Sequence, residues 1–94
     1  MTFKILIDDE AQEFLDALPK KSQRIVRERL FSLEEDPFPG KGGDKELIKE
    51  EKREKVYRMH ISHSYTTFYR VIEKTVYITE LMTIEQAHKK YDLL

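Results

Sequence analysis

Arg58 and His60 are the side chains of this sequence best suited to chemistry. They lie two residues apart in the segment KVYRMHIS, whose pattern predicts a strand, so both should point to one face. A histidine can act as a general base because its unperturbed pKa is near neutrality. An arginine can hold phosphate oxygens in a fork. The alternative is that both are ordinary solvated residues of an exposed strand.

Three adjacent strands are predicted around this pair, over 55–62, 64–73 and 75–83. Their short connections indicate an antiparallel meander. The face of the first strand opposite the charged pair carries three apolar side chains: Tyr57, Met59 and Ile61. One face of the sheet should therefore be core and the other a working surface.

A strand over 3–7 and two amphipathic helices are predicted before the meander. Asp8 or Asp9 is suited to cap the first helix, and Pro19 ends it and suits the start of the second. The first apolar stripe is Ala11, Phe14, Leu15 and Leu18; the second is Ile25, Val26, Leu30 and Leu33. A basic stripe on another face of the second helix is Lys20, Arg24 and Arg27.

The expected architecture is α+β, with an N-terminal strand, a helical hairpin, a three-stranded antiparallel meander and a short C-terminal helix or tail. The helices should pack on one face of the sheet. Six helix residues should be buried against the Tyr57 side: Phe14, Leu15, Leu18, Val26, Leu30 and Leu33.

The segment over 41–54 is mostly charged, with the sequence KGGDKELIKEEKRE. Such charge runs favour a solvated linker. Over 45–55 the alternatives are a short helix, a disordered loop, or an edge strand with Leu47 and Ile48 tucked in. The functional alternative is a basic lip beside the sheet. Interleaved glutamates argue against a simple phosphate clamp.

Composition limits the classes of protein that fit. The 94 residues predict one domain over 1–94. No stretch approaches the ~20 apolar residues that span a bilayer, no signal-peptide pattern is visible, and cysteine is absent. We therefore expect a cytoplasmic protein without a membrane partner. With a net charge of −1, any nucleic-acid site must be a local basic patch.

Metal, nucleophile and cofactor chemistry find little support in the sequence. The three histidines, His60, His63 and His88, lack a carboxylate pattern that would complete a metal site. No serine or cysteine nucleophile motif and no glycine-rich phosphate loop is present. We expect neither a metal nor a small-molecule cofactor.

The order of these elements, with the strand YRMHI, the strand ending FYRVIE and the tail HKKY, resembles the RelE/ParE toxin superfamily. The resemblance covers nearly the whole chain and is most specific over 56–91. It implies a small toxin that pairs with a cognate antitoxin protein. The RelE branch implies metal-independent cleavage of mRNA on the ribosome, and the ParE branch implies inhibition of DNA gyrase.

Aligned with RelE-like nucleases, two lysine positions on the first meander strand fall on Arg58 and His60. The resemblance implies that His60 acts as base and Arg58 holds the phosphate. An arginine expected after the tyrosine of the second strand is replaced by Thr66, which cannot stabilise phosphate charge. Arg70 should point to the same face of the strand as Thr66, but it lies about 13 Å along the strand, too far to take the place of the missing arginine.

The family's remaining cation maps onto Gln86 or its neighbours. His88, Lys89 and Lys90 are possible replacements. Tyr91 matches a C-terminal tyrosine that stacks on a base, although packing of the tail onto the sheet is the alternative. The catalytic set implied is Arg58, His60, His88 and Tyr91, with Arg70, Lys89 and Lys90 as substrate-binding residues.

Two functions are consistent with these residues. The first is a metal-independent endoribonuclease toxin whose partners are an antitoxin, the ribosome and mRNA. The second is a non-enzymatic protein on the same fold, either directed at gyrase or limited to antitoxin binding. Arg58, His60, His88 and Tyr91 favour the first, whereas Thr66 and the pI of about 6.3 favour the second.

Overall fold

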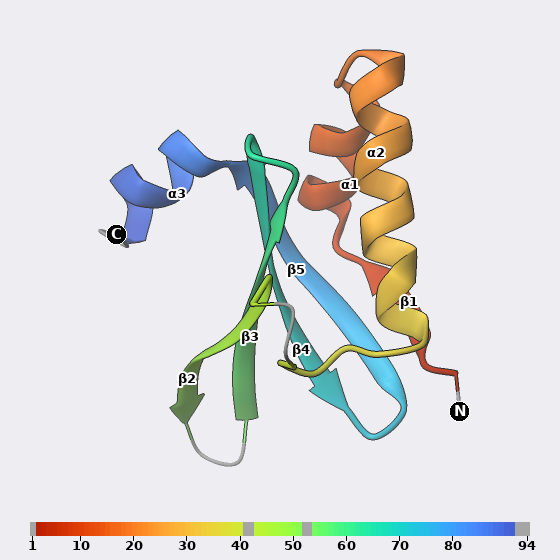
Figure 1. Cartoon of the computed structure of the whole chain (residues 1–94), viewed down its shortest axis with the longest axis vertical. Coiled ribbons are helices and arrows are strands. Elements are labelled where there is room, and N and C mark those ends of the chain that lie inside the picture. The colour runs from red at the N-terminus through yellow and green to blue at the C-terminus, as the bar shows by residue number, and fades with distance from the viewer. Residues whose placement is uncertain (1, 41–42, 52–53, 92–94) are drawn as a thin grey trace.

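The computed structural model describes residues 2–40, 43–51 and 54–91. Three helices and a five-stranded mixed sheet form an α+β fold (Figure 1). In chain order the elements are β1 (Lys4–Ile7), α1 (Asp9–Asp16), α2 (Lys20–Phe31), the 3-10 turn η1 (Ser32–Glu34), β2 (Lys45–Glu51), β3 (Glu54–Ile61), β4 (Tyr65–Ile72), β5 (Thr75–Thr83) and α3 (Ile84–Tyr91).

The start of α1 is fixed by Asp8, whose carboxylate accepts a hydrogen bond from the Glu10 amide. A side-chain acceptor at this position satisfies one of the free amides of the first turn. Pro19 is the N-terminal cap of α2, as expected from its place between the two helical patterns. Figure 1 shows α2 running back beside α1, so the predicted helical hairpin is present.

The meander β3-β4-β5 is antiparallel throughout, as predicted. The full strand order is β1-β5-β4-β3-β2, so the meander is the centre of a wider sheet. At one edge β1 pairs parallel to β5, with Ile5 opposite Val76. The edges left for further pairing are therefore β1 and β2, and not the outer strands of the meander.

The expectation of a solvated linker after Gly40 is wrong for residues 45–51, which form the edge strand β2 antiparallel to β3. Residues 41–42 and 52–53 of the same segment lie outside the described residues. Ile48 packs on a small apolar cluster, whereas Leu47 is 44% exposed. A register shift between Leu47 and Lys49 accompanies this arrangement. Alternating charges are common on edge strands because they discourage unwanted pairing.

The main core lies between α1, α2 and one face of the sheet. Tyr57, Met59 and Ile61 are buried there, as the strand periodicity predicts. The six helix residues expected in this core all contribute: Leu15, Val26, Leu30 and Leu33 are buried, and Phe14 and Leu18 are partly buried against them. The face predictions for helices and sheet are therefore confirmed.

Ile25 was expected in the apolar stripe of α2 but is 38% exposed. The buried stripe follows Val26, Leu30 and Leu33 at the spacing i, i+4, i+7, and Ile25 is rotated by about 100° from Val26. It therefore points away from the sheet.

The opposite face of the sheet has a second, smaller apolar cluster. Phe68, Met82 and Ala87 are buried, with Ile48 and Val56 packed against them. Ala87 belongs to α3, which lies on the side of the sheet away from α1 and α2 (Figure 1). This face remains partly open. Along the described chain, no helix has both the length and the apolar character needed to cross a membrane.

Candidate functional site

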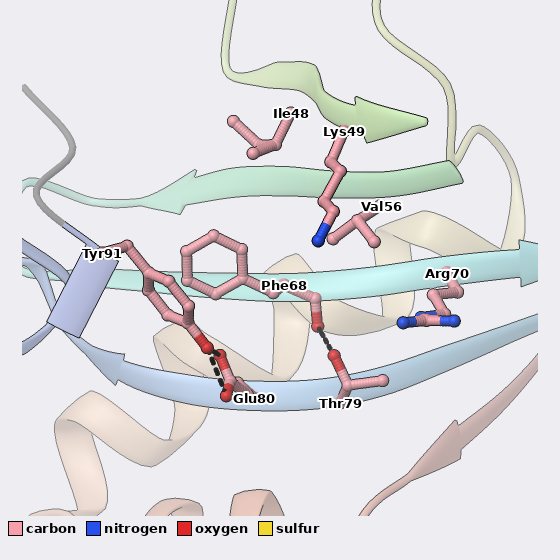
Figure 2. A pocket seen from close by; sticks show the side chains of 8 residues that line it. All are labelled: Ile48, Lys49, Val56, Phe68, Arg70, Thr79, Glu80 and Tyr91. Carbon is pink, nitrogen blue, oxygen red and sulfur yellow. Dashed lines mark hydrogen bonds between the residues drawn. The ribbon is translucent and has the colours of Figure 1, made fainter. Parts of the chain in front are cut away.

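A groove of about 410 Å³ opens on the sheet face opposite α1 and α2 (Figure 2). Its walls come from β2, β3, β4, β5 and the end of α3. The lining residues are Ile48, Lys49, Val56, Phe68, Arg70, Thr79, Glu80 and Tyr91. Arg70 and Tyr91 are therefore the two predicted site residues in the wall of this groove.

Arg58 is directed to the same face, because its register partner on β4 is Phe68. The Arg58 side chain is only 11% exposed and forms an ion pair with Glu46 on β2. Its Nε atom is buried without a hydrogen-bond partner in the structure. Burial also lowers the pKa of Arg58. Arg58 is therefore a largely desolvated cation held by a carboxylate, and not the solvated strand residue that the alternative interpretation required.

His60 is partly buried beside Arg58 on β3. The pKa of His60 is lowered from its ordinary value by burial and by the positive charges of Arg58 and His88, while Asp44 acts weakly in the opposite direction. A lowered pKa favours neutral imidazole, the form that accepts a proton. His88 on α3 is exposed and close enough to His60 to affect its titration. The structure thus places Arg58 and His60 on one face of β3, with His88 of α3 within electrostatic range of His60.

Thr66 is the register partner of His60 and is 1% exposed. Its hydroxyl donates a hydrogen bond to the backbone carbonyl of Met59, at 3.2 Å. The side chain therefore stabilises the β3–β4 pairing from a buried position. It offers no charge for a phosphate.

Tyr91 packs onto the sheet, which is the alternative that the sequence offered, and part of its ring stays exposed. Its ring packs on Phe68 with centroids 5.0 Å apart, yet the residue is 40% exposed. The Tyr91 hydroxyl donates hydrogen bonds to Glu80 on β5. Burial and the Glu80 carboxylate raise the pKa of Tyr91, so its hydroxyl remains protonated at neutral pH. One ring face can therefore be fixed by the protein while part of the ring remains accessible.

Glu80 is the site residue that sequence reasoning missed. Its carboxylate accepts hydrogen bonds from the Tyr91 hydroxyl and, at 2.8 Å, from the Lys90 ammonium. Its position opposite Phe68 depends on a register shift in the β4–β5 ladder between Phe68 and Tyr69. The available signal was a single carboxylate within the apolar strand TVYITELMT. Strand periodicity alone could not show that it joins the groove.

The remaining predicted cations are spread along this face. Arg70 forms an ion pair with Glu54, and the side chains are 38% and 52% exposed. Exposed pairs of this kind contribute little to stability. Lys90 bonds to Glu80, which raises the pKa of the Lys90 ammonium, and Lys89 is exposed on α3. Carboxylates therefore neutralise Arg58, Arg70 and Lys90 in this structure.

No group of three or more histidine, aspartate or glutamate side chains in the described ranges is arranged to hold a metal ion. The polar atoms of the groove come instead from two cations, one carboxylate and two hydroxyl groups: Lys49, Arg70, Glu80, Thr79 and Tyr91. This set can bind a ligand that has both a flat apolar part and an anionic part.

Comparison with solved structures identifies related folds. A chain of the archaeal RelE–RelB complex from Pyrococcus horikoshii OT3 aligns with a TM-score of 0.75 and 26% identity, over 88% of this chain and 96% of that chain. The RelBE2 toxin–antitoxin complex of Mycobacterium tuberculosis gives 0.71 and 17%, over 88% and 99%. The isolated Escherichia coli RelE toxin gives 0.68 and 18%, over 97% and 99%. No protein-family model and no curated protein matches the sequence.

The molecule is therefore a small α+β protein with a helical hairpin on one sheet face and a charged groove on the other. That fold is the fold of the RelE toxins. The predicted resemblance to the RelE/ParE superfamily is confirmed on its RelE-like side.

Proposed function

We propose that this protein is the toxin of a toxin–antitoxin pair and that it cleaves mRNA on the ribosome in the cytoplasm. The RelE structures that share its fold support the toxin assignment. The observation that carries the cleavage proposal is the cluster of Arg58, His60 and His88 on the open face of the sheet. An imidazole whose lowered pKa favours the neutral form, beside the Arg58 guanidinium, suits attack on a phosphodiester.

The proposed reaction uses the 2′-hydroxyl of the RNA as nucleophile. His60 removes the 2′-hydroxyl proton, the oxygen attacks the adjacent phosphorus, and the bond to the 5′-oxygen breaks. His88 donates a proton to that leaving oxygen. The products are a 2′,3′-cyclic phosphate and a 5′-hydroxyl. Arg58, with Lys89 or Lys90, stabilises the charge on the phosphorane. No metal takes part in this scheme.

Phosphate binding by Arg58 requires that the guanidinium exchange Glu46 for an RNA oxygen. Such an exchange is feasible because Glu46 is 48% exposed and can turn into solvent. Tyr91 contributes the accessible part of its ring to base stacking while Phe68 supports it from within the protein.

Single-turnover cleavage of mRNA on programmed ribosomes tests the proposal. His60→Ala should slow cleavage by about 10²–10⁴-fold, the usual contribution of a positioned general base. His63→Ala is the matched control, because His63 is an exposed turn residue and should leave the rate unchanged. Wild-type rates for His60→Ala would exclude His60 as the base.

We further propose that the partner is a small antitoxin encoded beside this protein. Two of the similar solved structures are complexes of a RelE-type toxin with its antitoxin. The antitoxin segment would lie across the helices, or add a strand at an edge formed by β1 or β2. Co-expression with the neighbouring gene product and size-exclusion chromatography should give one complex. Separate elution of the two proteins would contradict this pairing.

A binding-only toxin directed at gyrase is the second candidate. The buried Thr66 and the carboxylates bonded to Arg58, Arg70 and Lys90 favour it, because they reduce the positive charge available to RNA. Primer extension on mRNA from an in vitro translation reaction, run beside a gyrase supercoiling assay, separates the two activities. Loss of supercoiling without mRNA cleavage would support this second function.

A further inference from the structure

The β5 wall of the groove presents two hydrogen-bond acceptors side by side. Glu80 is an anionic carboxylate, and both of its oxygens face the Tyr91 hydroxyl. Thr79 uses its single hydroxyl proton to bond the Phe68 carbonyl at 3.1 Å, so its oxygen keeps only acceptor capacity toward the groove (Figure 2). A ligand that contacts this wall must therefore supply hydrogen-bond donors.

The side walls are apolar and suit a flat ring. Phe68 and Tyr91 form an aromatic wall from β4 and α3, and Ile48 and Val56 form an aliphatic wall from β2 and β3. A volume of about 410 Å³ lies in the range typical of small-ligand sites. One unpaired nucleotide fits such a space.

Charge sets the direction in which a nucleotide would lie. Arg70 is further along β4 than Phe68, away from the end where Glu80 and Tyr91 meet (Figure 2). A phosphate can pair with Arg70 once Glu54, which is 52% exposed, turns into solvent, whereas the Glu80 carboxylate offers a phosphate no donor. The base is therefore directed toward Glu80.

Building on the proposed RNA substrate, we propose that this groove reads one unpaired base and that Glu80 selects a base carrying an exocyclic amino group, cytosine over uracil. The 4-amino group of cytosine donates to a carboxylate, a pairing that proteins use to read this base. Uracil carries a carbonyl oxygen at that position, which would face the carboxylate without a hydrogen between them.

The existing bonds of Glu80 leave room for this contact. A carboxylate has about four lone-pair positions. Lys90 and Tyr91 occupy part of them and hold the carboxylate in place.

The test measures binding alone, by fluorescence anisotropy of labelled 2′-O-methyl oligonucleotides, eight cytidines against eight uridines, at pH 7.5. The 2′-O-methyl group blocks cleavage through the 2′-hydroxyl but leaves the bases unchanged. Wild-type protein should bind the cytidine oligomer at least about fivefold more tightly, the lower limit for one good base contact. Equal affinities would overturn the proposal without the need for any variant.

Two variants assign the preference to Glu80. Glu80→Gln should bring the affinity ratio close to one, because an amide can turn to donate or accept. Glu80→Asp keeps a carboxylate and should keep the direction of the preference. Glu85→Gln, an exposed carboxylate on α3 outside the groove lining, is the matched control and should leave the ratio unchanged. A cytidine preference that persists in Glu80→Gln would refute the role of Glu80.

The outcomes of this test are separable from those of the cleavage assay. A cytidine preference in a protein that leaves mRNA intact would support base selection by the groove and contradict the proposed nuclease function. Cleavage on ribosomes without any difference between the two oligomers would retain the nuclease and reject this inference.

Discussion

Arg58 on β3 and Glu46 on β2 form an ion pair across the edge of the sheet, with 11% of the arginine side chain exposed against 48% of the glutamate. The strand that supplies Glu46 is the segment whose charges suggested a linker. The Glu46 carboxylate is bonded to the guanidinium group that binds phosphate in the proposed reaction. In the free protein Glu46 therefore competes with RNA for Arg58.

Replacing Glu46 should strengthen RNA binding. In Glu46→Gln the competing charge is removed, and we expect affinity for a single-stranded RNA oligomer to rise about three- to tenfold, equivalent to about 0.6–1.4 kcal/mol. Anisotropy titration measures it. Glu50→Gln is the control, because Glu50 is on the same strand but opposite Lys55. Unchanged affinity in Glu46→Gln would show that Arg58 takes no part in binding RNA.

The acid side of the pH–rate profile should reflect His60. Burial, Arg58 and His88 lower the pKa of His60 below 6.5, with Asp44 opposing them. The base is active when neutral, so kcat/KM should fall only as pH drops below 6.5, with its midpoint at the lowered pKa. An NMR titration of the His60 ring measures the same value without activity. A midpoint above 6.5 would contradict the environment described here.

The lowered pKa of His60 also makes the free energy of unfolding depend on pH. The unfolded chain keeps His60 at its ordinary pKa of 6.5, whereas the folded protein binds that proton less readily. As pH falls below 6.5, protonation therefore favours the unfolded state, and the His60 contribution to the free energy of unfolding declines until the folded pKa is passed. Urea titrations of wild type and His60→Ala over this pH range isolate the contribution.

Tyr91→Ala should weaken binding of RNA more than it changes chemistry. The substitution removes the accessible ring and its support on Phe68. Stacking of one base is worth about 1–3 kcal/mol, so KM should rise by roughly one to two orders of magnitude. Tyr77→Ala, which removes another partly exposed strand tyrosine outside the groove lining, is the comparison. A loss confined to kcat would indicate a role in the reaction step instead.

A buried hydroxyl fixes the connection between α2 and the sheet. Tyr69 is fully buried, and its hydroxyl donates to the Pro37 carbonyl at 2.7 Å. Burial raises the pKa of Tyr69, so the hydroxyl stays a donor. Tyr69→Phe should lower the free energy of unfolding by about 1–3 kcal/mol, because it leaves the carbonyl unpaired. Urea denaturation measures this loss, and Tyr77→Phe should cost less than half as much.

The sequence predicted the features that depend on local periodicity. The alternation around Arg58 and His60 identified the two faces of β3, and the spacing of Leu15, Val26 and Leu30 identified the helix faces. These patterns hold because side-chain direction follows directly from backbone geometry.

Features that depend on pairing between distant strands could not be predicted in this way. Strand β2 forms because β3 offers it a hydrogen-bonding edge and because Ile48 finds an apolar cluster, neither of which is visible in a charge run. Glu80 reaches the groove only through the register shift after Phe68. The neutralising role of Glu46 likewise depends on its register with Arg58.

Thr66→Arg tests whether the arginine that the family resemblance calls for can be restored. Thr66 is 1% exposed and its hydroxyl bonds the Met59 carbonyl, so an arginine there would lose that bond and bring a charge into a buried position. We expect the free energy of unfolding to fall by more than about 2 kcal/mol and mRNA cleavage to show no gain. Thr66→Ser, which keeps the hydroxyl, is the control and should lose less than half as much stability. A stable Thr66→Arg protein with faster cleavage would mean that this strand can present a phosphate-binding cation after all, and that the present site is an attenuated form of the RelE arrangement.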